Sequence, residues 1–113
     1  MAVSILAPFW HEATDADGNP TGERYQLRGL KALELFDVNA HAIVKDDQVS
    51  FPGASIKAGL MCGLLGWEGV NDENGAPIPF KKTHIENLSF QVMSQLFGQI
   101  MGASSLGVEA AKN

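Results

Sequence analysis

The chain has 113 residues, carries 8 Lys and Arg against 13 Asp and Glu, and has a formal net charge of −5. This length fits one domain with a hydrophobic core of its own, and a hydrophobic content of 45% excludes a disordered acidic tail. The acidic balance argues against nucleic acid and against an anionic membrane surface as partners, because both need clustered Lys and Arg.

The N-terminal part of the chain, 1–28, predicts a β-hairpin. Two segments of strand-type residues, 3–10 and 24–27, flank a polar loop over 15–22 that is rich in turn formers. After this hairpin, apolar residues recur at three- and four-residue spacing. They predict one helix over 30–44, or two short helices that part near Asn39.

Helical spacing returns after a second loop, where Ile56, Leu60 and Leu64 predict a helix over 54–66. Gly59 and Gly63 lie four residues apart on one face of that helix. Each glycine costs up to about 1 kcal/mol relative to alanine. Two interpretations stay open: a neighbouring element approaches this face closely, or the helix is weak and tolerates both glycines.

A third loop over 69–82 leads to the clearest local signal in the chain. Thr83 and Glu86 form a capping-box pattern, which predicts that a helix begins at Thr83. The helix is expected to run to Met101, where Gly102 offers a stop. The remainder, 102–113, is small and polar enough to be a flexible tail.

This last predicted helix is unusually apolar. Two adjoining stripes cover a wide arc of its surface, and no charged residue lies between Glu86 and Glu109. Either the helix is the central helix of a small domain, or the stripe rich in Met and Phe faces a partner. In the same way, Trp67 and Phe80 either pin the long loop onto the core or anchor a recognition surface. The candidate protein-binding residues are Trp67, Phe80, Phe90, Met93, Phe97 and Met101.

No set of residues points to catalysis, a cofactor or a metal. The histidines His11, His41 and His84 lack metal-ligand spacing, and no phosphate-binding or nucleophile motif occurs. The segment 15–19 resembles the start of a calcium loop, but later positions fail the pattern, so a polar turn is expected. Cys62 lies in an apolar segment without a local base and is expected to be a buried hydrophobe.

We therefore expect an α+β domain that is mostly α. It would be a single domain over 1–113, with a β-hairpin over 1–28, a core of about three helices over 29–101 and the tail over 102–113. A single cysteine, no basic N-terminal start and no apolar run long enough for a bilayer favour a soluble cytoplasmic protein.

One stretch resembles a known family. Residues 64–80 read LLGWEGVNDENGAPIPF and precede the capped helix, and residues 25–34 read YQLRGLKALE. These patterns are similar to those of the tail assembly chaperones of long-tailed bacteriophages, most closely over 64–90 and more loosely over 24–40. The first 23 residues and the part after Met101 match nothing in that pattern.

The resemblance implies a non-enzymatic chaperone of the host cytoplasm that is absent from the mature virion. Such a protein binds the tape measure protein, keeps it soluble and promotes assembly of the tail tube, whose subunit is a further partner. Self-association into a homo-oligomer stays open. The alternative is a structural virion protein, such as a head–tail connector or minor tail component.

The family also offers an interpretation of the C-terminus. Its short chaperone is often extended by a programmed −1 frameshift near the end of the reading frame. Residues 111–113, Ala-Lys-Asn, can be encoded as GCA-AAA-AAC, which contains the slippery heptamer A-AAA-AAC. An ordinary polar tail is the other interpretation.

Overall fold

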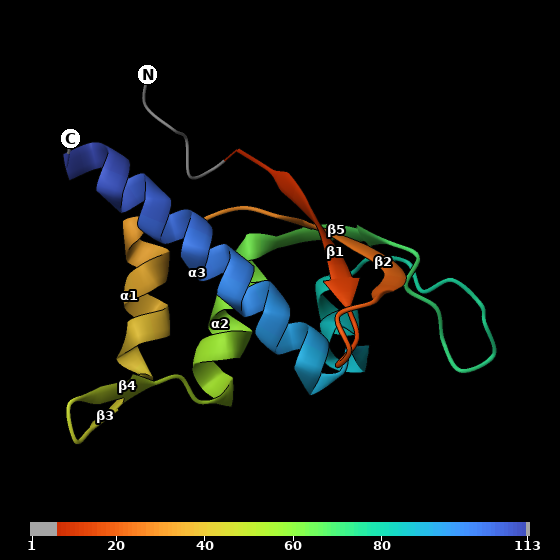
Figure 1. The fold of residues 1–113 in the computed structure, drawn as a ribbon, viewed down its shortest axis with the longest axis horizontal. Helices are drawn as coiled ribbons and strands as arrows, with labels where there is room; N and C mark the ends of the chain where they lie inside the picture. Colours follow the sequence, from red (N-terminus) through yellow and green to blue (C-terminus); the bar gives the residue numbers. More distant parts are fainter. Residues whose placement is uncertain (1–6, 113) are drawn as a thin grey trace.

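A three-stranded antiparallel sheet and a long helix that runs along it organise the fold (Figure 1). The computed structural model describes the backbone of residues 7–112 and the side chains of residues 7–104. In chain order, the elements are β1 (Phe9–Thr14), β2 (Pro20–Leu27), α1 (Ala32–Ala40), β3 (Ile43–Lys45), β4 (Gln48–Ser50), α2 (Gly53–Gly63), β5 (Leu64–Glu68), the 3-10 helix η1 (Lys82–Asn87) and α3 (Phe90–Lys112). The predicted α+β class is confirmed. With 42% helix and 28% strand, "mostly α" holds only approximately.

The N-terminal hairpin predicted from the sequence is present as β1 and β2, and β5 adds a third strand to the other edge of β2. Its first strand lies later than the predicted 3–10, of which 3–6 fall outside the described residues, and its second strand begins earlier than the predicted 24–27. The connection between β1 and β2 is the polar turn that was expected. The Asp15 carboxylate accepts hydrogen bonds from the amides of Asp17 and Asn19 at 2.9 and 3.0 Å. Gly18 supplies the positive φ of 84° that the turn requires.

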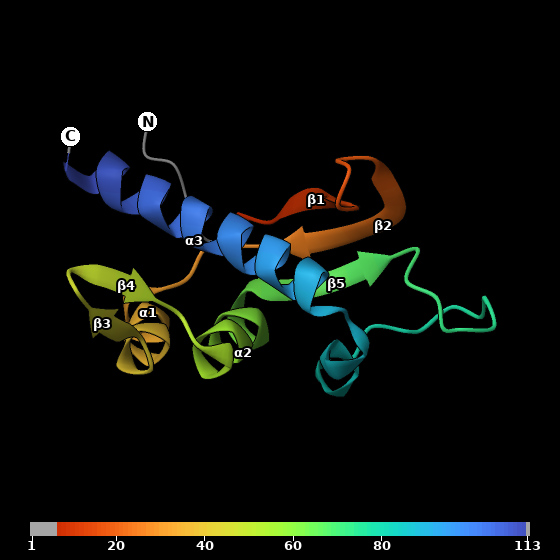
Figure 2. The same ribbon diagram turned by 60° about the horizontal axis from the view of Figure 1, so that its bottom comes forward.

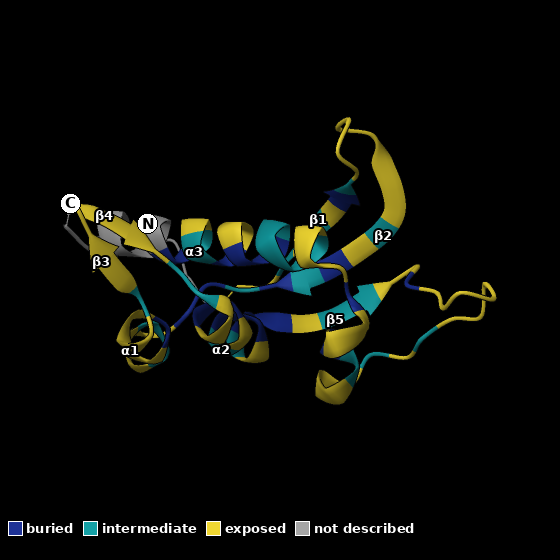
Figure 3. Ribbon diagram, turned by 90° about the horizontal axis from the view of Figure 1, so that it is seen from below, coloured by how far each residue is buried: buried dark blue, intermediate teal, exposed yellow. Residues whose placement is uncertain are grey.

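The core lies where α3 meets the sheet and α2 (Figure 2). α3 contacts β1 and β2 as well as α2, and α1 packs on α2. The fully buried side chains here include Leu27, Leu60, Leu64, Leu96 and Ile100. Figure 3 shows that buried segments gather around this junction, whereas β3, β4 and the long loop after β5 are exposed.

The helix predicted over 30–44 is shorter than expected, because α1 ends at Ala40. The apolar residues that continued the helical spacing belong instead to β3, which pairs with β4. Asp46 and Asp47 make the connecting turn with φ angles of 54° and 63°. Two adjacent residues with positive φ are characteristic of a type I′ hairpin turn. The segment after Ala40 therefore forms this hairpin instead of continuing the helix.

The helix predicted over 54–66 is also shorter, because α2 ends at Gly63. Leu64 adopts an extended conformation and begins β5, whose residues pair with β2. The periodicity of 54–66 could not reveal this strand, because its partner lies some forty residues earlier in the chain.

The helix predicted over 83–101 is divided. Thr83 lies inside η1 instead of capping an α-helix, and Leu88 is extended with ψ at 148°. The N-terminal cap of α3 is Ser89, whose hydroxyl accepts a hydrogen bond from the Val92 amide at 3.2 Å. The break lets Ile85 and the apolar face of α3 reach the core in different directions.

α3 does not stop at Gly102, and the predicted flexible tail over 102–113 is helical as far as Lys112. The extra turns are tied to the rest of the fold by Ser104. Its buried hydroxyl accepts a hydrogen bond from the Leu30 amide at 2.8 Å and donates one to the Ile100 carbonyl at 2.8 Å. This distant contact outweighs the helix-breaking tendency of Gly102. Asn113 lies outside the described residues.

Candidate functional site

α2 and α3 pack closely because two glycines remove side chains from their contact. A Cβ atom on Gly59 would lie 2.8 Å from the Phe97 ring, and one on Gly63 would lie 2.7 Å from Ile100. Of the two interpretations of these glycines, close approach by a neighbour is therefore confirmed. The contact fixes two helices that form adjoining walls of the site described below.

Trp67 fastens the long loop after β5 to the sheet. Its indole N–H donates to the Ile78 carbonyl at 2.7 Å, and its ring meets Phe80 edge-on with centroids 4.9 Å apart. A second edge contact joins Trp67 to the buried ring of Tyr25. The interpretation of Trp67 and Phe80 as a pin that holds the loop is confirmed by these contacts.

The loop itself is ordered by its turn residues. Gly69 has a φ of 76°, and a Cβ there would lie 2.4 Å from the Gly22 carbonyl oxygen, so only glycine fits. The Asp72 carboxylate accepts hydrogen bonds from the amides of Asn74 and Ala76, both at 2.9 Å. The motif residues of 67–80 thus build a defined loop that delivers the chain to η1.

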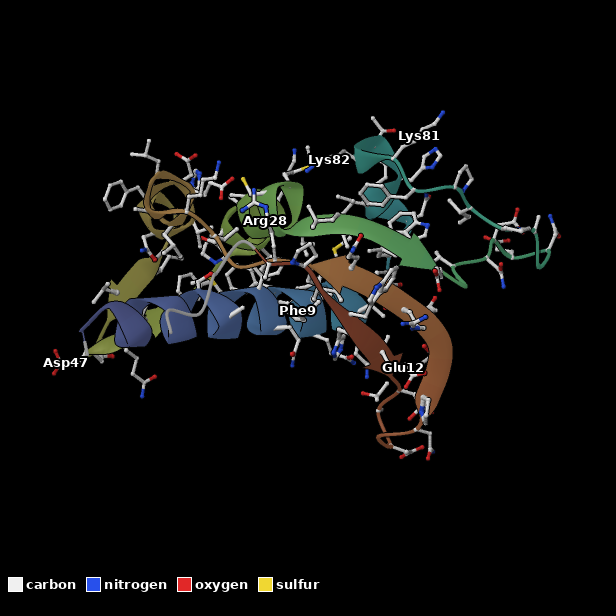
Figure 4. The ribbon with its side chains drawn as sticks, turned by 90° about the horizontal axis from the view of Figure 1, so that it is seen from above. Phe9, Glu12, Arg28, Asp47, Lys81 and Lys82 are labelled. Carbon is white, nitrogen blue, oxygen red and sulfur yellow. The ribbon has the colours of Figure 1, made fainter. Side chains whose placement is uncertain are left out.

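η1 is held at both of its sides. The His84 ring nitrogen Nδ1 lies 2.8 Å from the Pro79 carbonyl oxygen, which ties η1 back to the loop. The Lys82 ammonium donates to the Met61 carbonyl in the last turn of α2, where a positive charge is favoured by the helix dipole. Figure 4 shows Lys82 lying between η1 and α2.

Between α2, η1 and the start of α3 lies an open apolar groove with a volume of about 620 Å³. Its lining residues are Gly53, Ile56, Lys57, Leu60, Met61, Lys82, Thr83, Ile85, Glu86, Phe90 and Met93. We call this the α2–η1 groove. Apolar side chains form its floor, and its charged lining consists of Lys57, Lys82 and Glu86. Such a surface suits an apolar segment of another protein rather than a small polar substrate.

The six candidate protein-binding residues have different places in the fold. Phe90 is 71% exposed and lines the groove together with the half-buried Met93. Phe97 is only 8% exposed and packs edge-on against Phe51, so it belongs to the core instead of an exposed stripe. Met101 is half-buried against the core and lies outside the groove. Trp67 and Phe80 pin the loop, as described above.

No protein-family model, curated protein or solved structure matches this chain. The groove and its surroundings are therefore the basis for a functional proposal.

Several groove residues were not among the sequence candidates. Leu60 and Met61 show only ordinary helical spacing in the sequence, and Lys82 stands in a loop-like context. Their shared position depends on η1 folding back against α2, which local sequence does not encode. Met61, at 39% exposure, carries the one signal that could have been used, because a methionine beside a core leucine suits an adaptable surface.

The chemistry near the groove is that of a structural ion pair. Arg28 binds the Glu34 carboxylate with two hydrogen bonds of 2.8 Å, and this lowers the pKa of Glu34 to about 2. Burial, followed by the Glu34 charge, raises the pKa of the nearby Cys62 thiol. A reactive cysteine needs the opposite shift, so Cys62 is suited to packing rather than to nucleophilic attack. It is half-buried against the core, not fully buried as expected from the sequence.

Within residues 7–112, His, Cys, Asp and Glu side chains form no group of three that could hold a metal ion. The helices described in this range include none with the length and apolarity needed to cross a membrane.

Proposed function

We propose that this chain is a non-enzymatic assembly chaperone that binds an apolar segment of a larger protein in the α2–η1 groove. Given the resemblance over 64–90, we propose that the chain is a phage tail assembly chaperone and that its client is the tape measure protein. The chaperone would act in the host cytoplasm, promote assembly of the tail tube and leave the assembly before the virion matures. The tail tube protein would be a second partner.

The single observation that carries this proposal is the exposure of large apolar side chains along the groove. Phe90 and Met61 are exposed to solvent beside the buried Leu60. Burying such residues against a partner is favourable by roughly 25 cal/mol for each Å² removed from water. A groove walled by helices and floored by aliphatic and methionine side chains is the shape that receives one apolar face of a helix.

The motif that carries the resemblance supports the same site indirectly. Trp67 and Phe80 hold the loop that delivers η1, and η1 supplies the third wall of the groove. The motif thus has a structural role whose result is a binding surface. This agrees in kind with a protein whose task is to cover an apolar client.

The charged residues that line the groove indicate which charges a client segment should carry. Lys57 and Lys82 outnumber Glu86 along the groove, although the whole chain carries a charge of −5. The fitting segment is therefore amphipathic, with an apolar face and acidic residues at its flank.

The experiment is co-expression of this chain with the tape measure protein encoded at the same locus, followed by a solubility assay and a pull-down. We expect the client to be soluble and to co-purify only when this chain is present. A client that stays insoluble and unbound would contradict the proposal.

Groove variants locate the binding site. Phe90→Asp should abolish co-purification while leaving the fold intact, because Phe90 is 71% exposed. Trp10→Asp is the control, since Trp10 is an exposed aromatic residue on β1, outside the groove. Equal loss of client in both variants would mean that the groove is not the site.

A second candidate function is a structural virion protein. It is favoured by the apolar surface at the end of the molecule formed by α1, β3 and β4, which suits permanent assembly with other subunits. Mass spectrometry of purified virions separates the two functions. A chaperone is absent from the particle, whereas a connector or minor tail component is present in it.

A further inference from the structure

A second apolar surface lies at the end of the molecule opposite the long loop (Figure 1). It is formed by α1 and by the hairpin of β3 and β4, which lie next to each other in Figures 1 and 2. Its large exposed side chains are Leu33, Phe36, Ile43, Val44 and Val49, with Leu33 at 75% and Val44 at 71% exposure. We call this the α1–hairpin patch. It is separate from the α2–η1 groove and shares no residue with it.

The hairpin in this patch is a sheet of only two strands, and both of its edges are open among the described residues. An isolated two-stranded hairpin is marginally stable in water, and an open apolar edge is a template for further pairing. None of the residues of β3 and β4 is buried. Among residues 7–112, the hairpin therefore lacks the additional strand that would normally stabilise it.

The register decides which backbone groups face outward. Lys45 pairs with Gln48 across the two-residue turn, and Val44 pairs with Val49. In such a hairpin the pair beside the turn exchanges hydrogen bonds, so the next pair does not. The N–H and C=O groups of Val49 consequently point away from β3, toward the open edge of β4.

We propose that this edge pairs with β4 of a second copy of the chain, in an antiparallel arrangement about a two-fold axis at Val49. Each Val49 then donates its N–H to the carbonyl of the other Val49. The unpaired backbone groups of two identical edges thus form hydrogen bonds with each other. The side chains of Val44 and Val49 in both copies form one row across four strands. A four-stranded sheet with an apolar face meets the condition for stability that the lone hairpin does not meet.

The charges along the two edges favour β4 over β3. Pairing about Val49 sets Gln48 opposite Ser50 of the second copy, and β4 carries no charge. Pairing of β3 about Val44 would set the charged Lys45 opposite Ile43 of the second copy. A charged side chain opposite an aliphatic one makes no favourable cross-strand interaction and loses contact with water. The β3 edge is therefore less suited than the β4 edge to pairing with its own copy.

The aspartates of the turn do not oppose this dimer. In the Val49-centred register, Asp47 lies opposite Phe51 of the second copy. The two Asp47 residues are then four positions apart along the strands, or about 13 Å. That separation exceeds the Debye length of about 8 Å at physiological salt, so their repulsion is largely screened.

The first test is the mass of the purified full chain in solution across a range of concentrations, by light scattering and sedimentation. We expect twice the monomer mass. Val49→Pro should return the chain to a monomer, because it removes the outward N–H without breaking a hydrogen bond inside the hairpin. Val44→Pro is the matched control: it makes the same change on the β3 edge and should leave the dimer intact. A wild-type chain that is monomeric throughout, or a dimer that survives Val49→Pro, overturns the proposal.

The second test does not depend on how the proline variants fold. In a Cys62→Ser background, Val49→Cys places two thiols at directly opposed positions, whose Cα atoms would be about 5.5 Å apart, within disulfide range. Mild oxidation should link Val49→Cys chains into dimers and leave Val44→Cys chains unlinked. Linkage at position 44 in place of position 49, or at neither position, would refute pairing through β4. Phe90→Asp, which lies in the groove, should not alter either result.

Discussion

Three side-chain carbons of Ile100 lie 2.7, 2.8 and 2.9 Å from the position that a Cβ on Gly63 would occupy. Ile100 is itself fully buried on the inner face of α3, so it has no free space into which to move. The absence of a side chain at Gly63 is therefore a packing requirement of the α2–α3 contact. It outweighs the low helix propensity of glycine.

Gly63→Ala should lower the free energy of unfolding by about 1–3 kcal/mol, because the added methyl group overpacks the contact with Ile100. Gly98→Ala is the control, since Gly98 lies inside α3 with open space around its Cβ position. The free energy of unfolding of that variant should rise by up to about 1 kcal/mol, because alanine has the higher helix propensity. Urea denaturation monitored by circular dichroism measures both, and two shifts of the same sign would contradict this account.

Gly102→Ala tests whether α3 passes through Gly102. Because Gly102 is helical and has no neighbouring atom within 4 Å of its Cβ position, alanine should stabilise the chain by up to about 1 kcal/mol. A glycine that ended the helix would adopt a positive φ, and alanine there would destabilise the chain. The sign of the change in thermal midpoint therefore distinguishes a continuous helix from a helix that stops at Met101.

Trp67→Phe removes the indole N–H that binds the Ile78 carbonyl but retains an aromatic ring near Phe80. We expect the free energy of unfolding to fall by roughly 1–2 kcal/mol and amide exchange in the loop over 69–81 to become faster. Hydrogen–deuterium exchange with peptide resolution measures this effect. Trp10→Phe, at an exposed position of β1, should leave amide exchange in the loop unchanged. Equal acceleration in both variants would show that the indole hydrogen bond is not responsible.

The ion pair of Arg28 and Glu34 should make stability depend on pH in the acid range. Hydrogen bonding to Arg28 lowers the folded-state pKa of Glu34 from 4.5 to about 2, so the folded chain binds its proton less readily than the unfolded chain. The stabilisation is fully present above pH 4.5 and is lost as the pH falls toward 2, by about 2–3 kcal/mol. Glu34→Gln should be less stable at pH 7 and should lose less stability between pH 5 and pH 2.

Glu68→Gln is the matched control for the ion pair. Glu68 also pairs with an arginine, Arg24, but both side chains are about half exposed. An exposed pair contributes little, so this variant should change stability by less than about 1 kcal/mol. A change at Glu68 as large as the one at Glu34 would mean that burial does not set the strength of these pairs.

Local sequence signals predicted the features that depend on local chemistry. The hairpin of β1 and β2 followed from a polar turn between strand-like segments, and the close approach at Gly59 and Gly63 was one of two stated interpretations. The strands β3 and β5 were hidden, because their apolar residues also satisfy helical spacing. Only their pairing partners distinguish them from helix, and those partners are not visible in a short window.

The candidate site was predicted in part. Phe90 and Met93 were identified from the apolar stripe of the last helix, and both line the groove. The sequence left open whether the stripe that contains Phe97 is core or interface, because periodicity shows which residues share a face but not what covers it. The structure buries Phe97 in the core. The lysines of the groove could not be found without knowing that η1 folds back onto α2.

The glycine contact between α2 and α3 also has a consequence for movement. Two helices that interlock this tightly behave as one rigid body, so two walls of the groove keep a fixed spacing. The third wall, η1, buries Ile85 in the core and leads into α3 through the buried residue Leu88. Its hydrogen bonds to the carbonyls of Pro79 and Met61 tie it to the loop and to α2. We therefore expect the groove to keep nearly the same width with and without a client, so the bulk of the apolar side chains that a client inserts decides how well it fits.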